Sequence, residues 1–365
     1  MFLELTNEQR KCFGLHPVEE HWKRIKIKAS PYDHFETYVY IDNCIIKKSV
    51  MCGNNFFNES ELEELLSEDL KYLLPKTAKG KPALLSSSTL RKRKAAGMMF
   101  AYHNGYISLS NCNTQRDYYI SSYERPEVNS LEDFSDWVSR WCEETTQEDL
   151  EDVARFAQQE RKHVKFREGD VFRFKLNRRL YGYGRIILDY SKMRKNKEPF
   201  WDILMTKPLV CSAYHILTER KDIRIQDLEH LRSTPSTFIA DNNLFYGEYE
   251  IIGNIPVRET EDYPIMYGRS IHVGETAVVF QCGKLYRRIE NGQTLYPNFT
   301  NNGIGFLMNT KIPVLQQCIA ENSNMPYWNQ HRWAPVNHDL RNPKFRKELE
   351  EICAQFGISP SQLDL

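Results

Sequence analysis

Apolar and polar residues alternate along the first part of the chain with the period of antiparallel strands. The stretch FETYVYIDNCIIKKSVM alternates well enough to form two strands, and Asp42-Asn43 favours a turn between them. Asn104-Gly105 marks a second hairpin turn in the strand-like stretch GMMFAYHNGYISLSNCNTQRDYYISSYE. The pattern predicts an N-terminal α+β domain at residues 1–125.

A segment with helical periodicity lies between these predicted strands. Ser60 and Glu63 have the spacing of a capping box, and Pro75 ends the run. Five leucines fall on one helical face, at Leu62, Leu65, Leu66, Leu70 and Leu73. We therefore predict a helix here. The following basic stretch, in which residues 71–94 hold eight Lys or Arg and no acid, is typical of an exposed loop.

Residues 126–162 change to a helical and acidic pattern. Ser130 and Thr146 are positioned to cap two helices. The first helix has an apolar face of Leu131, Phe134, Trp137, Val138 and Trp141. Ten acids and one arginine lie between Glu127 and Asp152, so the outer face is expected to be strongly negative. We predict an acidic helical connector between two sheet domains.

Strand character returns after residue 162. Several short strands with little helix between them predict a small curved antiparallel sheet or barrel at 163–262. The stretch FWDILMTKPLVCSAYHIL is predicted to be helix-like or irregular, and Asp241-Asn242-Asn243 to be a hairpin turn.

Residues 263–365 have the pattern of a C-terminal extension. Cys282-Gly283 is the expected turn of a hairpin, and a terminal helix is expected to begin at Asn342 and end at Gly357. The predicted fold class is therefore α+β, with two mainly antiparallel sheet domains, the connector and this extension.

The sequence YGYG at 181–184 raises the question of a phosphate-binding loop. Such a loop needs its glycines to end a strand and open a helix, whereas here they lead into the strand-like RIILDY. Glycine inside a strand marks a bulge, a tight bend or the close approach of another backbone. Gly182 and Gly184 share one face, so we predict that they leave space on it.

Composition and charge give no global indication of a partner. The chain has 49 basic and 49 acidic residues, and no window approaches the roughly 18 apolar residues of a membrane span. Nine cysteines without a CxxC pair are typical of reduced thiols. The beginning lacks the pattern of a signal peptide. We expect a cytoplasmic protein without a membrane partner.

Candidate catalytic and metal-binding groups are few. Cys12, His16 and His21 are suitable zinc ligands, but no partner pair has the spacing of a zinc finger. Cys211 and His215 are close in sequence, although a nucleophile and its base normally meet from distant positions. None of the common hydrolase, protease, kinase or phosphate-loop motifs is present. We expect no catalytic site, no cofactor and no metal.

Residues 161–197 carry thirteen Lys or Arg against three acids, interleaved with Tyr and Phe. Such a run suits phosphate contacts and base stacking. The acidic segment directly before it would repel the same ligand, so a solvated or ion-paired face is favoured and nucleic acid is disfavoured. A nucleic-acid-associated protein remains the alternative function, and an enzyme with an unrecognised site a third.

The stretch KHVKFREGDVFRFKLNRRLYGYGRIIL resembles the opening of the immunity protein 26 family of bacterial polymorphic toxin systems. The matching positions are Gly169, Asp170, Val171, Phe172, Tyr181, Gly182, Tyr183, Gly184 and Arg185. The N-terminal part is similar to a segment that often accompanies such domains, through LTNEQRKCFGL, YIDNCIIKK, YLLPKTAKGKPALLSSSTL and GMMFAYHNGYISLSNCNTQRDYY. The resemblance covers about 5–123 and 163–255. It leaves the tail after about Tyr263 unmatched.

This resemblance implies a non-enzymatic immunity protein that binds a cognate toxin protein and neutralises it by occlusion. If the toxin is a nuclease, its active surface is basic, and the acidic helices are expected to face it. The candidate contact residues are Glu143, Glu144, Asp149 and Asp152, together with Arg178 and Arg179 in a hairpin turn expected to be exposed. The two arginines depart from the family pattern.

Overall fold

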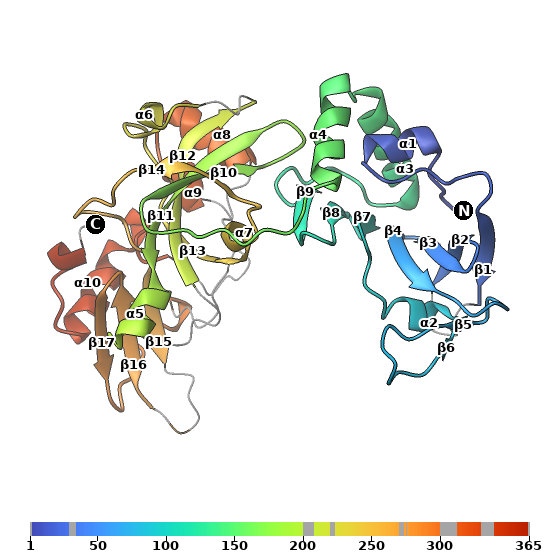
Figure 1. Cartoon of the computed structure of the whole chain (residues 1–365). Coiled ribbons are helices and arrows are strands. Elements are labelled where there is room, and N and C mark those ends of the chain that lie inside the picture. The colour runs from blue at the N-terminus through green and yellow to red at the C-terminus, as the bar shows by residue number, and fades with distance from the viewer. Residues whose placement is uncertain are drawn as a thin grey trace. The chain divides into compact units, whose positions relative to one another are not determined.

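The computed structural model describes residues 2–28, 34–199, 208–219, 223–269, 274, 276–299, 312–329 and 339–363. Two compact units make up the chain (Figure 1). The first unit comprises Met1–His163 and Lys175–Arg178, and the second comprises Val164–Phe174 and Arg179–Leu365. No helix in these described ranges is long and apolar enough to cross a membrane.

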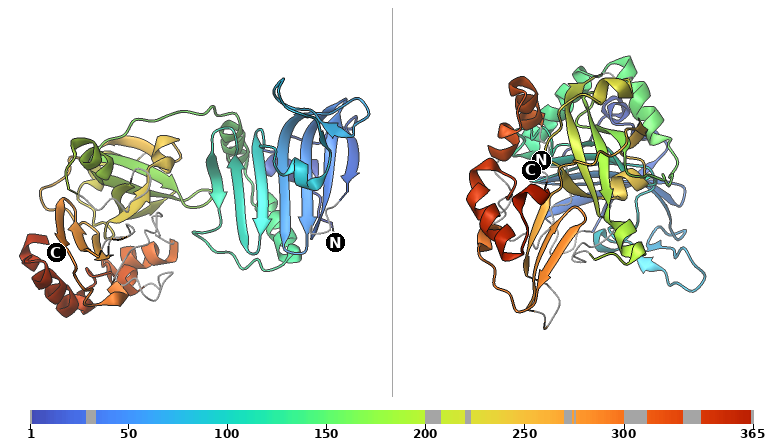
Figure 2. Two further views of the ribbon diagram at one scale, coloured as in Figure 1. Left: turned by 90° about the horizontal axis from the view of Figure 1, so that it is seen from below. Right: turned by 90° about the vertical axis from the view of Figure 1, so that its left-hand side faces the viewer.

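A seven-stranded antiparallel sheet forms the centre of the first unit, in the order β1-β2-β3-β4-β7-β8-β9 (Figure 2, left). The strands are β1 Lys23–Ile27, β2 Phe35–Asp42, β3 Ile45–Gly53, β4 Phe56–Leu65, β7 Met98–His103, β8 Tyr106–Asn111 and β9 Arg116–Ile120. Both predicted hairpin turns are confirmed. Asn43 and Asn104 adopt positive φ angles of 53° and 47°, which asparagine tolerates better than most residues.

Three helices cover one face of this sheet, namely α1 Asn7–Cys12, α3 Leu131–Glu143 and α4 Gln147–Ala157 (Figure 1). The predicted caps are present, since the side chains of Ser130 and Thr146 accept hydrogen bonds from the third residue of each helix. The apolar face of α3 packs on the sheet in one aromatic core, which includes Phe13, Phe57, Phe100, Phe134, Trp137 and Trp141. Because that face is buried on the sheet, α3 and α4 are part of the first unit and not a separate connector.

The helix predicted from Ser60 onward is wrong. Residues Phe56–Leu65 form strand β4, which pairs with β3 on one side and with β7 on the other. Leu62 is buried in the strand, whereas Leu65, expected on the inner helical face, is 51% exposed. The ladder with β3 runs from Phe56 to Leu65 and the ladder with β7 from Phe56 to Ser60, and this strand pairing outweighs the helical spacing of the leucines.

The opposite face of the sheet is covered by the insertion between β4 and β7. It contains the short strands β5 Tyr72–Leu73 and β6 Ala83–Leu84 and the helical turn α2 Ser87–Leu90. Leu73 and Leu90 of this insertion are buried against Ile41, Ile46 and Leu62 of the sheet. The basic loop is therefore held in place by apolar side chains at two points.

The second unit is built on a five-stranded antiparallel sheet in the order β13-β12-β11-β10-β14, which is not closed into a barrel. The strands are β10 Asp170–Lys175, β11 Tyr181–Asp189, β12 Pro208–Thr218, β13 Thr237–Ala240 and β14 Glu250–Asn254. Short helices α5 Tyr190–Asn196, α6 Ile225–Leu228 and α7 Asn242–Phe245 connect them.

The glycines of the YGYG stretch make room for two phenylalanines of the neighbouring strand. A Cβ atom on Gly182 would lie 2.6 Å from the Phe174 ring, and one on Gly184 would lie 2.7 Å from the Phe172 ring. The register of β11 against β12 also shifts between Gly182 and Gly184. The predicted bulge is present, and the space predicted on the glycine face holds the two phenylalanine rings.

Two predictions for the second unit are wrong. The stretch expected to be helix-like contains β12, a fully paired central strand, while its residues 200–207 lie outside the described part. Asp241-Asn242-Asn243 does not close a hairpin but leads into helix α7, and β13 pairs with β12 and not with β14. The turn-forming side chains here begin a helix instead.

The C-terminal part contains a three-stranded sheet of β15 Ile265–Arg269, β16 Val278–Cys282 and β17 Leu285–Ile289. The predicted hairpin at Cys282-Gly283 is confirmed. Helix α10 Arg346–Gln355 follows the 3-10 turn Pro343–Phe345, which Asn342 caps as predicted, and its apolar side packs on this sheet. The remaining helices are α8 Ile312–Glu321 and α9 Met325–Asn329, with 3-10 turns at Pro297–Phe299 and Pro360–Leu363.

Candidate functional site

The helices α3 and α4 present a group of exposed carboxylates, which we call the acidic surface. Its members are Glu127, Glu132, Asp136, Glu143, Glu144, Glu148 and Glu151. Two of the predicted contact residues, Glu143 at the end of α3 and Glu144 directly after it, are among them. The apolar residues of both helices are turned to the sheet, so the amphipathic pattern leaves these carboxylates in water.

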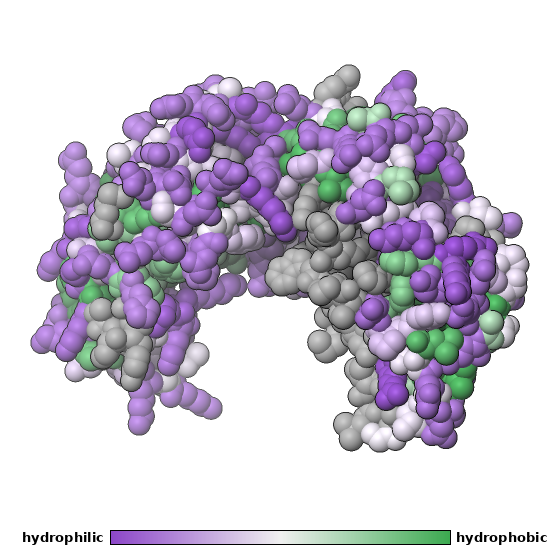
Figure 3. Space-filling model, turned by 180° about the vertical axis from the view of Figure 1, so that it is seen from behind, coloured by the Kyte–Doolittle hydropathy of each residue, from purple (hydrophilic) through white to green (hydrophobic). Residues whose placement is uncertain are grey.

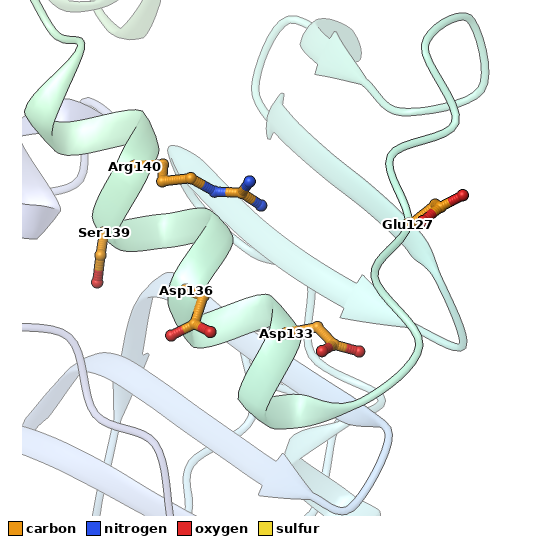
Figure 4. Close-up of a pocket in the computed structure, with 5 residues that line it drawn as sticks. All are labelled: Glu127, Asp133, Asp136, Ser139 and Arg140. Carbon is orange, nitrogen blue, oxygen red and sulfur yellow. The ribbon is translucent and has the colours of Figure 1, made fainter.

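A shallow hollow of about 410 Å³ lies beside the first turns of α3. Asp133, Asp136 and Arg140 project from α3 along it, and Glu127 comes from the segment that leads into the helix (Figure 4). The backbone N–H groups of Asn129 and Ser130 donate to Asp133, and these bonds lower the pKa of its carboxyl. The hollow therefore has mainly negative walls with one cation.

Asp149, predicted as a contact residue, is buried and forms the capping box at the start of α4 with Thr146. Its Oδ2 accepts hydrogen bonds from the backbone N–H and the hydroxyl of Thr146, both at 2.9 Å. The expectation that it lies on the outer face is wrong. The sequence contained the signal for this role, because a capping Thr followed three residues later by an acid is the capping-box pattern.

Arg178 and Arg179 have different environments. Arg178 is buried, with its guanidinium 4.5 Å from the Trp141 ring centre, 2.9 Å from the Trp141 carbonyl oxygen and 3.3 Å from Asp149 Oδ2. Its expected exposure is therefore wrong, because an aromatic face, a carbonyl and a carboxylate together enclose the cation. Arg179 is exposed, as expected for the turn.

Asp152 lies in a polar cluster at the sheet side of α4. Its Oδ2 accepts hydrogen bonds from the Tyr118 hydroxyl at 3.2 Å and from Lys175 Nζ at 3.0 Å. Burial and the Asp152 charge raise the pKa of Tyr118 above its ordinary range. Asp152 is half-buried and already engaged, so it is a weaker contact candidate than Glu143 or Glu144.

The basic segment 161–197 is partly ion-paired. Six of its cations contact carboxylates, in the pairs Arg167–Asp170, Arg173–Glu250, Lys175–Asp152, Arg178–Asp149, Arg185–Glu261 and Lys192–Glu168. These pairs involve six of the thirteen cations that a nucleic-acid groove could use. The structure therefore gives the nucleic-acid alternative no specific support.

A second hollow, of about 440 Å³, lies in the basic insertion of the first unit. Lysines 76, 81, 92 and 94 and Arg93 line it together with Glu64. The buried Glu64 carboxylate pairs with Lys76 at 2.7 Å and with Arg93 at 3.2 Å. The sequence predicts these cations in an exposed loop and gives no indication of the Glu64 carboxylate with which two of them pair.

Two of the candidate chemical groups, Cys211 and His215, lie on strand β12. No three His, Cys, Asp or Glu side chains gather there as metal ligands would. Cys211 is buried, and burial raises the pKa of its thiol well above the ordinary value. His215, on the same strand, is hydrogen-bonded through Nε2 to Asn324 Oδ1 at 2.8 Å.

On the face shown in Figure 3, hydrophilic side chains predominate and the hydrophobic ones are scattered.

Together, these features define an α+β protein of mainly antiparallel sheets whose prominent surface features are charged. Residues 167–278, from just before β10 to the first residue of β16, match the family model Immunity protein 26. The resemblance predicted from the Gly-Asp strand and the YGYG stretch is thereby confirmed for this segment. The resemblance of the N-terminal part stays a prediction. No curated protein and no solved structure matches the chain.

Proposed function

We propose that this chain is a cytoplasmic immunity protein of a bacterial polymorphic toxin system, which binds a cognate toxin and blocks its active surface without catalysis. The observation that carries the proposal is the family match over residues 167–278. Neutralisation by occlusion needs a complementary surface on the inhibitor but no reacting group of its own.

We further propose that the acidic surface makes contact with the toxin. Glu143 and Glu144 are exposed and lie next to each other at the end of α3. Exposed like charges raise the association rate of a partner with opposite charge and set its orientation. A toxin with a basic active surface, such as a nuclease, has the matching chemistry.

In the experiment, bacterial cells express the chain together with the toxin domain that is encoded beside it. Binding is then measured with the two purified proteins. Cells that make the toxin alone stop growing, and cells that also make the chain survive. Survival that is no better with the chain than without it would reject the proposed function.

The contact surface is tested by charge reversal. Glu143→Lys/Glu144→Lys in the first unit is compared with Glu229→Lys/Glu259→Lys, a matched change at exposed glutamates of the second unit. We expect only the first double variant to weaken binding. If only the second weakens it, the contact lies on the family-matched unit and the acidic surface is not the site.

A further inference from the structure

The hollow in the basic insertion of the first unit, which we call the basic hollow, gathers positive charge in a small space. Its volume is about 440 Å³, and five cations line it, namely Lys76, Lys81, Lys92, Arg93 and Lys94. They come from two segments, one between strands β5 and β6 and one directly after helix α2. Glu64 is the acidic member of the lining, and Thr77 adds a hydroxyl group.

Both segments are anchored close to the lining residues. Leu73 and Leu90, which lie two or three residues before a lining cation, are buried against the sheet. The turn between Thr77 and Gly80 is closed by a hydrogen bond from the Gly80 N–H to the Thr77 carbonyl oxygen at 3.0 Å. Gly80 packs so closely on Pro75 that a Cβ atom there would lie 2.6 Å from the Pro75 Cβ. The cations therefore project from an anchored backbone, which lowers the entropy that a ligand must remove on binding.

Glu64 orients two of the cations without neutralising the hollow. Its carboxylate is 1% exposed and lies 2.7 Å from Lys76 Nζ and 3.2 Å from Arg93 Nη1. Arg93 Nη2 also donates to the Leu74 carbonyl oxygen at 3.2 Å. One carboxylate offsets one positive charge, so four of the five charges stay uncompensated by the lining residues.

The other three cations of the basic hollow are available to a ligand. In the described part of the chain, no carboxylate lies within ion-pair distance of Lys81, Lys92 or Lys94, and all three are exposed. Like charges in a concave site repel one another and raise the local concentration of anions. A bound anion would relieve this repulsion, so the arrangement favours a ligand with several negative charges.

We propose that the basic hollow binds a small anion with several adjacent phosphate groups, as in a nucleoside triphosphate or inorganic tripolyphosphate. A terminal phosphate carries up to two negative charges and three acceptor oxygens, whereas a carboxylate carries one charge. Adjacent phosphates therefore match the charge density of this site, and the Arg93 guanidinium suits phosphate oxygens. The volume lies in the range of roughly 300–1,000 Å³ that is typical of small-molecule sites.

The inference is independent of the proposed function. The basic hollow is lined by residues between Glu64 and Lys94, whereas the family match covers residues 167–278. The substitutions used below leave the acidic surface unchanged. Loss of anion binding and loss of toxin binding are therefore separate results.

The first test titrates the full chain with sodium tripolyphosphate by isothermal calorimetry, in a phosphate-free buffer of low ionic strength. We expect saturable binding that is about tenfold tighter than binding of citrate, whose charges are on carboxylates. The affinity should fall as sodium chloride is added, because salt screens exposed charges. Absence of saturable binding, or citrate bound as tightly, would overturn the proposal.

A pair of matched variants assigns the binding to the basic hollow. Lys92→Ala/Lys94→Ala removes two exposed cations that line it, and Lys23→Ala/Lys28→Ala removes two exposed cations of the same unit that do not. We expect the first double variant to bind tripolyphosphate about tenfold more weakly and the second to bind it as the unsubstituted chain does. Equal affinities of the two variants would contradict the site. Thermal unfolding shows that both are folded.

The source of the phosphates is distinguished by competition. The described residues that line the basic hollow carry no aromatic ring on which a base could stack, so ATP and tripolyphosphate should compete with similar affinity. Tighter binding of ATP would support the site and identify a nucleotide as its ligand. A short strand of deoxythymidine nucleotides that displaces tripolyphosphate at a much lower concentration than ATP would assign the surface to nucleic acid and overturn the proposal.

A chemical map locates the anion without any variant. The full chain is acetylated briefly with an N-hydroxysuccinimide ester, with and without saturating tripolyphosphate, and its peptides are quantified by mass spectrometry. We expect the anion to slow acetylation of Lys81, Lys92 and Lys94 several-fold and to leave Lys23 and Lys28 unchanged. Unchanged acetylation of the three lining lysines would place the anion elsewhere and overturn the proposal.

Discussion

Lys48 Nζ lies 2.8 Å from Glu59 Oε1, and both side chains are completely buried in the first unit. Arg10 Nε reaches the same carboxylate oxygen at 2.7 Å from α1. One carboxylate on β4 therefore compensates two buried cations, Lys48 on β3 and Arg10 on α1. Buried ions need such partners, because each has lost its hydration.

Glu59→Gln should be among the most destabilising single changes in the first unit. It leaves two buried cations uncompensated, and we expect a loss of about 3–5 kcal/mol in the free energy of unfolding. Lys48→Met should cost less, because the Arg10–Glu59 pair remains. Urea unfolding followed by circular dichroism measures both. Glu8→Gln, at an exposed pair with Lys11, is the control and should leave the midpoint unchanged.

Gly184→Ala should destabilise the second unit by about 1–3 kcal/mol, because the new methyl group overpacks the sheet. Its Cβ would lie 2.7 Å from the Phe172 ring and 2.8 Å from the Ser212 carbonyl oxygen, which strand pairing holds in place. At Gly182 the neighbour is the Phe174 ring alone. Combining Gly182→Ala with Phe174→Leu should therefore cost less than the sum of the two, as measured by thermal unfolding. Strict additivity would refute the steric explanation.

Arg178 and Arg179 should respond differently to the same substitution. Arg178→Ala removes a buried cation from Asp149 and Trp141, and we expect a loss of about 2–4 kcal/mol in the stability of the first unit. Arg179→Ala, at the exposed neighbour, should cost clearly less. The urea midpoints of the two variants are compared, and equal losses of stability would contradict the burial of Arg178.

His215 should make the second unit sensitive to mild acid. Burial lowers the pKa of its imidazole below the ordinary value of 6.5, and the Arg232 charge acts in the same direction. The unfolded chain therefore binds a proton more readily than the folded one, so stability is present above pH 6.5 and is lost as the pH falls through the lowered pKa. Unfolding measured across this range should show the decline, and His215→Gln should flatten it.

Binding through the acidic surface should depend on ionic strength. Salt screens exposed charges, so the association rate with a basic toxin should fall as salt is added, while the dissociation rate changes little. Glu143→Lys/Glu144→Lys should lower the association rate at low salt and make that rate less dependent on the salt concentration. Stopped-flow mixing measures both, and an association rate indifferent to salt would argue for an uncharged contact.

Local signals in the sequence were sufficient where local chemistry decides the structure. The turns at Asn43 and Asn104, the caps at Ser130 and Thr146, and the glycine spacing of β11 were predicted because each depends on neighbouring residues. Glu143 and Glu144 were expected on the outer face because residues 127–152 are rich in acids, and both are exposed.

Long-range contacts explain the failures. Strand β4 was taken for a helix because its leucines have helical spacing, while the deciding partners are strands β3 and β7. Arg178 was placed in solvent because nothing near it in the sequence shows that Trp141 and Asp149 enclose it.

Trp141 gives this protein an optical reporter of its own. Its indole N–H donates a hydrogen bond to the Cys12 carbonyl oxygen, and its ring lies against the Arg178 guanidinium. Cys142 follows it in the chain. Its share of the emission of the six tryptophans, obtained by comparison with Trp141→Phe, is a label-free signal from the place where α1, α3 and residues 175–178 meet.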